Sequence, residues 1–357
     1  AERAHGSSVV QWPQTAVAVE MGAKCTHTAG ASPAADPDGP AEAPVQPPSE
    51  PSSETPDGCC AVDEAVQAIM AGGESCQTLL LSSLAVLDAG AVRLAAALRA
   101  EGAAGRGEVE VLNLGINKLT DQGAVALSAA LPASNIRTLS LERNSLTHEG
   151  VAAVAGSLPF SLERLMLGRN NVGAEGAGAL ALALATSQRR LHTLGLGFAG
   201  LHAAGAQAIV PAMAWVTVLD LSGNHLGQDG CACLAAGLRG PASALEVLKL
   251  ESNGAGDEGA RELGGALAAN TTLRELEVRR NSITDDGARC FALALEANVA
   301  LRRLDLFDNS ITDAGAQALL QAARKGKQSG SALSIIDLDI NDDVSAAMKA
   351  QIAAALA

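Results

Sequence analysis

Gly195, Gly197 and Gly200 form a G-x-G-x-x-G pattern, and Asp220 follows twenty residues later. Between a strand and a helix, such glycines hold the pyrophosphate of a dinucleotide, and an acidic residue at this distance binds its ribose. Here the next helix is expected only near Gly205, too late to place its N-terminus on a pyrophosphate. The same residues also fit the repeat described below. We therefore expect no dinucleotide and no other cofactor at this segment.

Other patterns that carry chemistry are missing from the sequence. It contains no G-x-S-x-G, no G-x-x-x-x-G-K-[ST] and no H-E-x-x-H. The histidines at 148, 192, 202 and 225 occupy different positions of the repeat, so we expect no metal site. Cys231 and Cys233 stand where another repeat has Ala124 and Ala126, which predicts small core residues. These observations favour a protein that is not an enzyme.

Composition limits the classes of protein further. The 357 residues are 48% hydrophobic but only 2% aromatic, so the core is aliphatic. The longest apolar stretches fall well short of the roughly twenty residues that cross a bilayer, which argues against a transmembrane protein. A net charge of −14 disfavours nucleic acid as a partner. Seven scattered cysteines give no disulfide framework, which favours a reducing, intracellular and cytoplasmic location.

From residue 79 onward the sequence repeats the pattern L-x-x-L-x-L-x-x-N-x-L. The copies are identified by an asparagine at positions 117, 144, 170, 224, 253, 281, 309 and 341, which we call the Asn column. Two further copies lack the asparagine, one starting at Leu79 and one with Ala199 in its place. The pattern predicts an array of about ten units with atypical copies at its ends.

A second column, of glycine, follows in each unit. Its members are Gly90, Gly123, Gly150, Gly176, Gly205, Gly230, Gly259, Gly287 and Gly315, spaced 28 residues apart on average. Apolar residues four and eight positions later form one helix face, as in Leu127 and Leu131. Thr120-Asp121, Thr284-Asp285 and Thr312-Asp313 precede this face and are expected to accept the first free N–H groups of a helix. Each unit is therefore a short strand, a turn and an amphipathic helix.

Such units are not stable alone, so neighbours must stack into a parallel sheet with helices outside. Helices are wider than strands, and the stack therefore curves with the sheet on its concave side. The Asn column lies where the chain leaves the strand. Its amide can satisfy backbone groups of its own turn and of the next one, which explains why an amide recurs there.

These units resemble the ribonuclease-inhibitor-like class of leucine-rich repeats over residues 79 to 345. The resemblance implies an α/β leucine-rich-repeat solenoid, a horseshoe with a concave parallel β-sheet and outer α-helices. It says little about function, because the same horseshoe serves inhibitors, innate-immune receptor domains, Ran GTPase-activating proteins and ciliary scaffolds. The domain organisation we expect is a disordered, Pro-rich acidic arm over 1–58, a repeat domain over 59–345 with a helical cap at 61–71, and a capping helix at 346–357.

A protein partner would dock on the concave face, whose residues are the variable positions of the strands. The expected binding residues are Arg143, Met166, Arg169, Phe198, Lys249, Glu251, Glu275, Glu277, Arg279, Arg280, Arg303, Asp305, Phe307 and Asp308, and Glu142, Arg164 and Asp220 share this face. Phe198 and Phe307 are two of only four phenylalanines in the chain. Exposed aromatic residues beside arginine are typical of interfaces. We therefore expect a non-enzymatic scaffold or adaptor that binds a protein partner.

Two other functions remain open. Arg143, Arg169 and Arg280, next to the Asn column, could supply charge for phosphoryl transfer in a GTPase-activating protein of the Ran-activator type. Alternatively, the chain could be a structural subunit of a ciliary or organellar assembly that uses its helices for contact. Arg-to-Ala changes at 143, 169 and 280 would distinguish catalysis from binding, because an activator would lose turnover and keep its partner. For a structural subunit, the test is whether the protein stays monomeric when it is purified alone.

The arm carries one further motif. Met21-Gly22-Ala23-Lys24-Cys25-Thr26 fits the N-myristoylation pattern, with Cys25 placed for palmitoylation. If Met21 were the start of the mature chain, acyl groups on Gly22 and Cys25 would tether the horseshoe to a membrane. Coincidence in a segment rich in small residues is the competing explanation.

Overall fold

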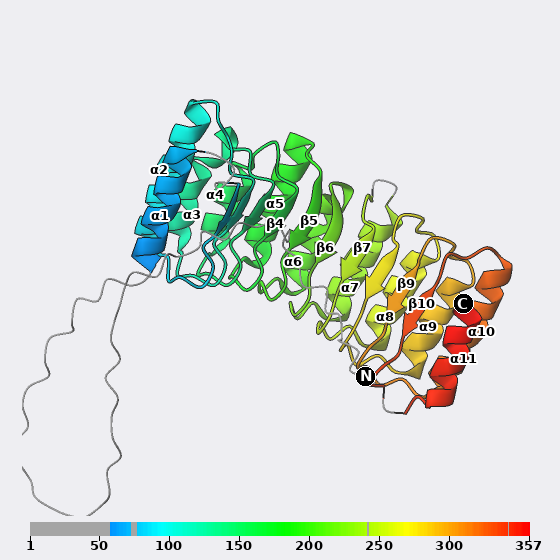
Figure 1. Ribbon diagram of the computed structural model, residues 1–357. Coiled ribbons are helices and arrows are strands. Elements are labelled where there is room, and N and C mark those ends of the chain that lie inside the picture. The colour runs from blue at the N-terminus through cyan, green and yellow to red at the C-terminus, as the bar shows by residue number, and fades with distance from the viewer. Residues whose placement is uncertain (1–57, 73–76, 241–242, 342) are drawn as a thin grey trace, which may run out of the picture.

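The computed structural model describes residues 58–72, 77–240, 243–341 and 343–357, and in them strands and helices alternate along the chain (Figure 1). The strands are β1 (Thr78–Leu80), β2 (Val111–Asn113), β3 (Thr138–Ser140), β4 (Arg164–Met166), β5 (Leu191–Gly195), β6 (Val216–Asp220), β7 (Val247–Lys249), β8 (Glu275–Glu277), β9 (Arg303–Asp305) and β10 (Ile335–Asp337). The helices are α1 (Gly58–Ala71), α2 (Asp88–Ala103), α3 (Asp121–Ser128), α4 (His148–Ala155), α5 (Gly173–Ser187), α6 (His202–Ile209), α7 (Gly227–Arg239), α8 (Gly256–Leu267), α9 (Asp285–Leu295), α10 (Asp313–Gln328) and α11 (Ala346–Leu356). Two short 3-10 turns, η2 (Leu131–Ala133) and η3 (Val210–Ala214), follow α3 and α6.

The ten strands form one parallel sheet whose order follows the chain from β1 to β10. Each strand pairs with the next in the same register, so that Leu112 lies beside Leu139 and Leu139 beside Leu165. Figure 1 shows the sheet along one side of an arc and the helices along the other. The predicted leucine-rich-repeat solenoid of about ten units is confirmed.

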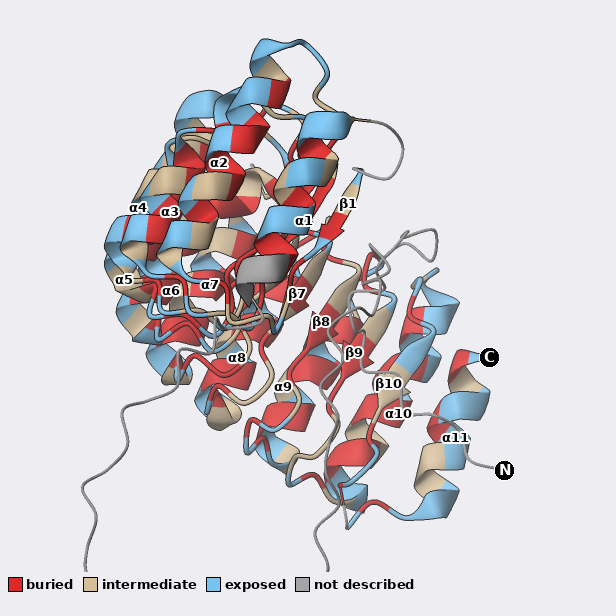
Figure 2. Ribbon diagram, turned by 60° about the vertical axis from the view of Figure 1, so that its left-hand side comes forward, coloured by how far each residue is buried: buried red, intermediate tan, exposed pale blue. Residues whose placement is uncertain are grey.

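The core lies between the sheet and the helices and runs the length of the stack. Leu112 and Leu114 point into it from one unit, and Leu127 meets them from α3; all three are fully buried. Figure 2 shows this buried layer facing inward on each helix, with exposed residues outward. The core is aliphatic as expected, with Phe291 as its largest fully buried side chain. Because every unit buries its apolar face against its neighbours, the sheet is held as a rigid curved surface.

The Asn column joins each turn to the preceding unit. In Asn281, the amide nitrogen donates to the carbonyl oxygen of Leu250 at 2.8 Å, and the amide oxygen accepts from the N–H groups of Asn253 and Ala255, both at 3.1 Å. The nitrogen also donates to the carbonyl oxygen of Arg279 in its own turn. The prediction that the amide serves its own turn is therefore confirmed, but its second partner is the unit before it, not the one after.

Threonine caps four of the helices. The hydroxyl groups of Thr120, Thr284 and Thr312 accept from the second N–H group of their helices, as predicted, and Thr147 does the same for α4. The aspartates that follow them have a different role from the one expected. Each binds the next unit: Asp285, for example, accepts from the N–H of Thr312 at 2.8 Å and from that of Gly315 at 2.9 Å.

This contact also explains part of the glycine column. A Cβ atom at Gly315 would collide with the carboxylate of Asp285, and one at Gly150 would collide with that of Asp121. At Gly123, Gly150, Gly287 and Gly315 the aspartate of the preceding unit fills the space that a side chain would need. At Gly176, Gly205 and Gly230 a side chain of the same unit does so, namely Val172, Leu201 and Leu226.

The two ends of the stack carry α1 and α11, at the places where the sequence predicts caps. That these helices act as caps stays a prediction, as do the domain boundaries. Residues 1–57 of the predicted arm, which include Gly22 and Cys25, lie outside the described residues, and Gly58 is the first residue of α1.

Candidate functional site: the concave face

The concave face is organised in rows that cross the strands. The middle row runs through Leu80, Asn113, Ser140, Met166, Gly195, Asp220, Lys249, Glu277, Asp305 and Asp337, which pair successively in register. This row is apolar or uncharged from β1 to β5 and charged from β6 to β10. Asp220 of β6 is the first charged residue of the row, and we divide the face after it into an N-terminal half over β1 to β6 and a C-terminal half over β7 to β10.

A second row lies just before the Asn column, and we call it the turn row. It includes Ile116, Arg143, Arg169, Phe198, Ser252, Arg280 and Asp308, all with φ between 51° and 57°. This left-handed conformation is uncommon for residues with a side chain. It recurs because the repeat places the same turn in each unit, also at Phe198, whose neighbour is Ala199; there the N–H of Ala199 donates to Asn224 Oδ1 of the next unit. The three arginines singled out from the sequence thus share one backbone geometry.

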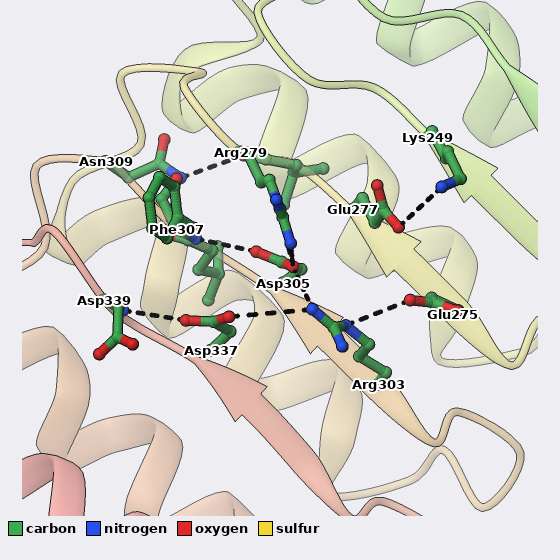
Figure 3. A network of polar contacts seen from close by, with 12 residues as sticks. Lys249, Glu275, Glu277, Arg279, Arg303, Asp305, Phe307, Asn309, Asp337 and Asp339 are labelled. Atoms are coloured by element: carbon green, nitrogen blue, oxygen red, sulfur yellow. Dashed lines mark hydrogen bonds and ion pairs between the residues drawn. The ribbon is translucent and has the colours of Figure 1, made fainter. Parts of the chain in front are cut away.

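Ion pairs fill the C-terminal half (Figure 3). The Asp305 carboxylate accepts from Arg279 Nε at 2.8 Å and from Arg303 Nη2 at 2.7 Å, and it also accepts from the N–H of Phe307. Arg303 reaches Glu275 at 3.1 Å on its other side. Burial alone would lower the pKa of the Arg279 guanidinium, but its bonds to Asp305 raise it above the ordinary value. The arrangement fixes both arginines in place.

Two further ion-pair groups flank this network. Lys249 lies 3.2 Å from Glu277, and Arg280 binds Asp308 at 2.7 Å and Glu251 at 3.1 Å. Burial raises the pKa of Glu277, and the charge of Lys249 acts in the opposite direction. Across β7 to β10 the concave rows hold four basic residues against seven acidic ones. The C-terminal half is therefore acidic, although all of its arginines are paired.

Three of the residues expected at a binding surface are buried. Asp305 has an exposed fraction of 0%, and Met166 and Glu277 are also buried. Met166 packs so closely over Gly195 that a Cβ there would meet its Sδ at 2.9 Å. The sequence pattern predicts which side of the sheet a residue occupies, but the curvature of the sheet crowds the middle row and covers these side chains. A partner could not touch Asp305 without displacing its arginines.

Both concave phenylalanines stack against arginine. The guanidinium of Arg169 lies 4.2 Å from the ring centre of Phe198, and that of Arg279 lies 5.4 Å from Phe307. Phe198 has an exposed fraction of 48% and its ring covers Gly223, where a Cβ would collide with it. Phe198 is therefore an exposed aromatic side chain held in a fixed position.

The N-terminal half has fewer acidic residues than the C-terminal half, and its arginines form fewer ion pairs with described residues. It holds Glu142, Arg143, Arg164, Arg169 and Asp220, three basic residues against two acidic ones. Burial raises the pKa of Glu142, and the negative charge of Asp220 adds to this, against the opposing effect of the two nearby arginines. A pocket of about 390 Å³ lies here, lined by Ser82, Asn113, Gly115, Ile116, Ser140, Glu142, Arg143 and Arg169. Asn113 and Ser140 were not expected at the site, although their place between two leucines of a strand would have identified them.

The glycines, cysteines and histidines that were considered for cofactor or metal binding have structural positions in the repeat fold. Gly195 is the last residue of β5, Gly197 lies in the turn after it, and the following helix begins at His202. Cys231 is a buried core residue, and burial raises the pKa of its thiol to about 12, whereas Cys233 is half-buried. His202 and His225, although they occupy different positions of the repeat, stack with ring centres 6.0 Å apart. In the described part of the chain, no group of three metal-ligating side chains comes together.

Comparisons with known proteins agree with this geometry. The model of the leucine-rich repeat family matches residues 109–128, 159–181, 212–235, 269–292 and 297–320. Ribonuclease inhibitor from Sus scrofa is 38% identical over 118 residues, which cover 32% of this chain and 26% of the inhibitor. The chain is a leucine-rich-repeat protein of the ribonuclease-inhibitor-like class. It matches about a quarter of the length of that curated relative.

Two solved structures are similar at low identity, one of them of a leucine-rich repeat-containing protein. LegL7 from Legionella pneumophila is 18% identical with a TM-score of 0.48, over 82% of this chain and 93% of that one. The yeast complex of Rad7 and Elc1 gives 14% identity and a TM-score of 0.31, over 81% and 90%. Among the described residues of this leucine-rich-repeat protein, no helix has both the length and the hydropathy that crossing a bilayer requires.

Proposed function

We propose that this leucine-rich-repeat protein is a non-enzymatic scaffold that binds a protein partner on its concave face. The surface is a sheet whose side chains are already fixed by stacking and ion pairs, so that little conformational entropy is lost when a partner docks. The net charge of −14 disfavours nucleic acid on the same face. The partner is therefore expected to be a protein.

One observation carries the proposal. In the described residues, the side chains of Arg143, Arg164 and Arg169 form no ion pair, and Arg169 lies beside the exposed ring of Phe198. Folding does not require three unpaired arginines and an exposed phenylalanine on one face. Arginine and aromatic side chains contribute much of the binding energy at protein interfaces. These four residues are accordingly the centre of the proposed contact.

The other predicted residues divide into two roles. Glu251, Arg280, Phe307 and Asp308 are at least partly exposed at the C-terminal half and are proposed to contact the partner. The buried residues Met166, Glu277 and Asp305, together with their partners Lys249, Arg279, Arg303 and Glu275, hold the surface in shape. Because the two halves differ in charge, a partner with complementary charges binds in one orientation only.

The test places a photo-crosslinking benzoylphenylalanine at position 198 of the full-length chain. The substitution keeps an aromatic side chain where Phe198 stands. The matched control carries the same group at Leu293, an exposed residue of α9 on the convex side. We expect a covalent adduct with a discrete partner from position 198 and none from position 293, with mass spectrometry of the adducts as the readout.

A second comparison tests the charge pattern. Arg143→Glu in the crosslinking variant is expected to remove the adduct, whereas Arg289→Glu on the convex face of α9 leaves it in place. Adducts from Leu293 alone would show that the helices make the contact and would refute the concave-face proposal.

A further inference from the structure

The pocket at the N-terminal half has a floor made of buried polar groups. Ser140 has an exposed fraction of 1% and Asn113 one of 8%, and both line the pocket. Gly115 lies between them: a Cβ there would sit 3.4 Å from the Ser140 hydroxyl oxygen and 3.1 Å from Asn113 Oδ1. The missing side chain at Gly115 therefore leaves these polar groups open to the pocket.

Two donors on this floor lack a partner among the described residues. Asn113 Oδ1 accepts from the N–H of Gly115 at 2.9 Å, but its amide nitrogen donates to none of them, and neither does the Ser140 hydroxyl. Both donor atoms keep some accessible surface, so they can be reached from the pocket. An amide N–H and a hydroxyl that open into a pocket are groups able to bind an acceptor.

The rim adds two positive charges. Arg143 and Arg169 line the pocket, and both are close enough to Glu142 for their charges to lower its pKa, although neither forms an ion pair with a described residue. In the C-terminal half, by contrast, Arg279, Arg280 and Arg303 are each bound to a carboxylate. Stacking on Phe198 holds Arg169 at the rim. In this half the one carboxylate of the lining, Glu142, lies near two arginines, so the lining carries one more positive than negative charge.

We infer that this pocket binds the side-chain carboxylate of an Asp or Glu residue from a partner protein. Arg143 and Arg169 would donate to its oxygens from the rim, and the Ser140 hydroxyl and Asn113 amide from the floor. Charge-assisted hydrogen bonds of this kind are among the strongest in proteins. The inference rests on the proposed scaffold function and names the chemistry of its contact.

The volume and the remaining charge fit a peptide that carries this acid. About 390 Å³ lies at the lower end of ligand pockets, enough for one side chain and part of its backbone. Glu142, the one carboxylate in the lining, can accept from a backbone N–H of the same peptide. A mid-chain acidic residue presents both groups at once, since its N–H and its carboxylate lie a few bonds apart.

The probe is the capped tripeptide acetyl-Ala-Glu-Ala-amide, titrated into the full-length chain and followed by the amide NMR signals of Gly115 and Ser140. The neutral control is acetyl-Ala-Gln-Ala-amide, which has the same shape without the charge. A third peptide, acetyl-Ala-Ala-Ala with a free terminal carboxylate, tests the other source of the same group. We expect the Glu peptide to shift both signals and to bind about tenfold more tightly than the Gln peptide.

Three variants locate the binding. Arg143→Gln and Arg169→Gln are each expected to weaken the Glu peptide about tenfold, the loss of one hydrogen bond to a charged group. Gly115→Ala, which reduces the pocket without changing its charge, should also weaken it. Arg289→Gln is the control, because it removes the same charge from an exposed arginine of α9 that does not line the pocket.

Equal binding of the Glu and Gln peptides, preference for the free terminal carboxylate, or equal weakening by Arg289→Gln would each overturn the inference. The crosslinking at position 198 is independent of these titrations. If it still captures a partner while the Glu peptide fails to bind, the pocket assignment is wrong and the scaffold function stands.

Discussion

Asp285 connects two units of the solenoid by three hydrogen bonds. Its carboxylate accepts from the N–H of Thr312, from the Thr312 hydroxyl at 2.8 Å and from the N–H of Gly315. Asp121 makes the same contacts with Thr147 and Gly150. Burial acts to raise the pKa of Asp285 and of Asp121, but the hydrogen bonds outweigh it and lower both.

Asp285→Ala is expected to lower the free energy of unfolding by about 1–3 kcal/mol, because it leaves two N–H groups at the start of α10 without their acceptor. Urea denaturation measures the change. Asp286→Ala is the matched control: it removes an aspartate from the same helix turn, but one whose ion pair with Arg289 is exposed. An equal loss in the two variants would mean that the helix dipole, and not the contact between units, accounts for the effect.

The lowered pKa gives this contact a pH dependence of known sign. An aspartate whose folded-state pKa lies below its unfolded value, about 3.9, stabilises the fold fully above that value and loses this effect as the pH falls through the folded pKa. We expect the difference in unfolding free energy between wild type and Asp285→Ala to be constant near neutral pH and to shrink on acidification. A difference that grows in acid would contradict the assignment. Glu142 and Glu277 have raised pKa values in the folded state, so their protonation in acid stabilises the fold, opposite to the effect of Asp285.

At the scale of the repeat element, the sequence shows which residues recur but not what they touch. The spacing of leucine, asparagine and glycine predicts a strand, a turn and a helix, and the structure has them in that order. The contacts of Asp285 and Asn281 were only partly foreseen, because both reach into a neighbouring unit. A pattern within one unit identifies positions in that unit, whereas the partner depends on how far stacked units are offset.

Asn281→Ala is expected to destabilise the fold by about 3 kcal/mol, since it leaves several buried backbone groups without partners. Asn281 has an exposed fraction of 0% and bonds to Leu250, Asn253, Ala255 and its own turn. Thermal and urea unfolding measure the change.

Asn171→Ala is the control, because Asn171 is an exposed asparagine beside the column, and its loss should change stability by less than about 0.5 kcal/mol. Similar small effects at both positions would show that water replaces the amide and that the column is not what joins the units.

At the scale of the whole molecule, the curved array decides which predicted site residues a partner could reach. The repeat register places Asp305 and Phe307 on the same face, and the structure does so too. Burial could not be predicted in the same way, because it depends on the curvature and on side chains from three adjacent strands. The pocket beside Arg143 depends likewise on Gly115, Ser140 and Asn113 meeting across units.

The end units of the array are expected to be its least stable ones. A solenoid unit contacts only its neighbours, so an end unit lacks half of its support unless another element covers it. In α11, Ile352 and Leu356 are buried against the last unit, and the Leu356 carbonyl accepts from Lys327 Nζ at 3.0 Å. We predict that α11 is the cap of the C-terminal end.

Ile352→Asp is therefore expected to release α11 and to speed amide hydrogen exchange in β10 and α10, while β2 to β5 keep their protection. The charged side chain cannot stay in the apolar contact, and the loss of α11 exposes the last unit but leaves distant units in contact with their neighbours. Hydrogen exchange followed by mass spectrometry reads each segment separately. Ala353→Asp, an exposed position of the same helix, is the control and should leave exchange unchanged. Faster exchange spread evenly from β1 to β10 would mean that the array unfolds as one cooperative unit, and that stability at the pocket and at the C-terminal end cannot be varied independently.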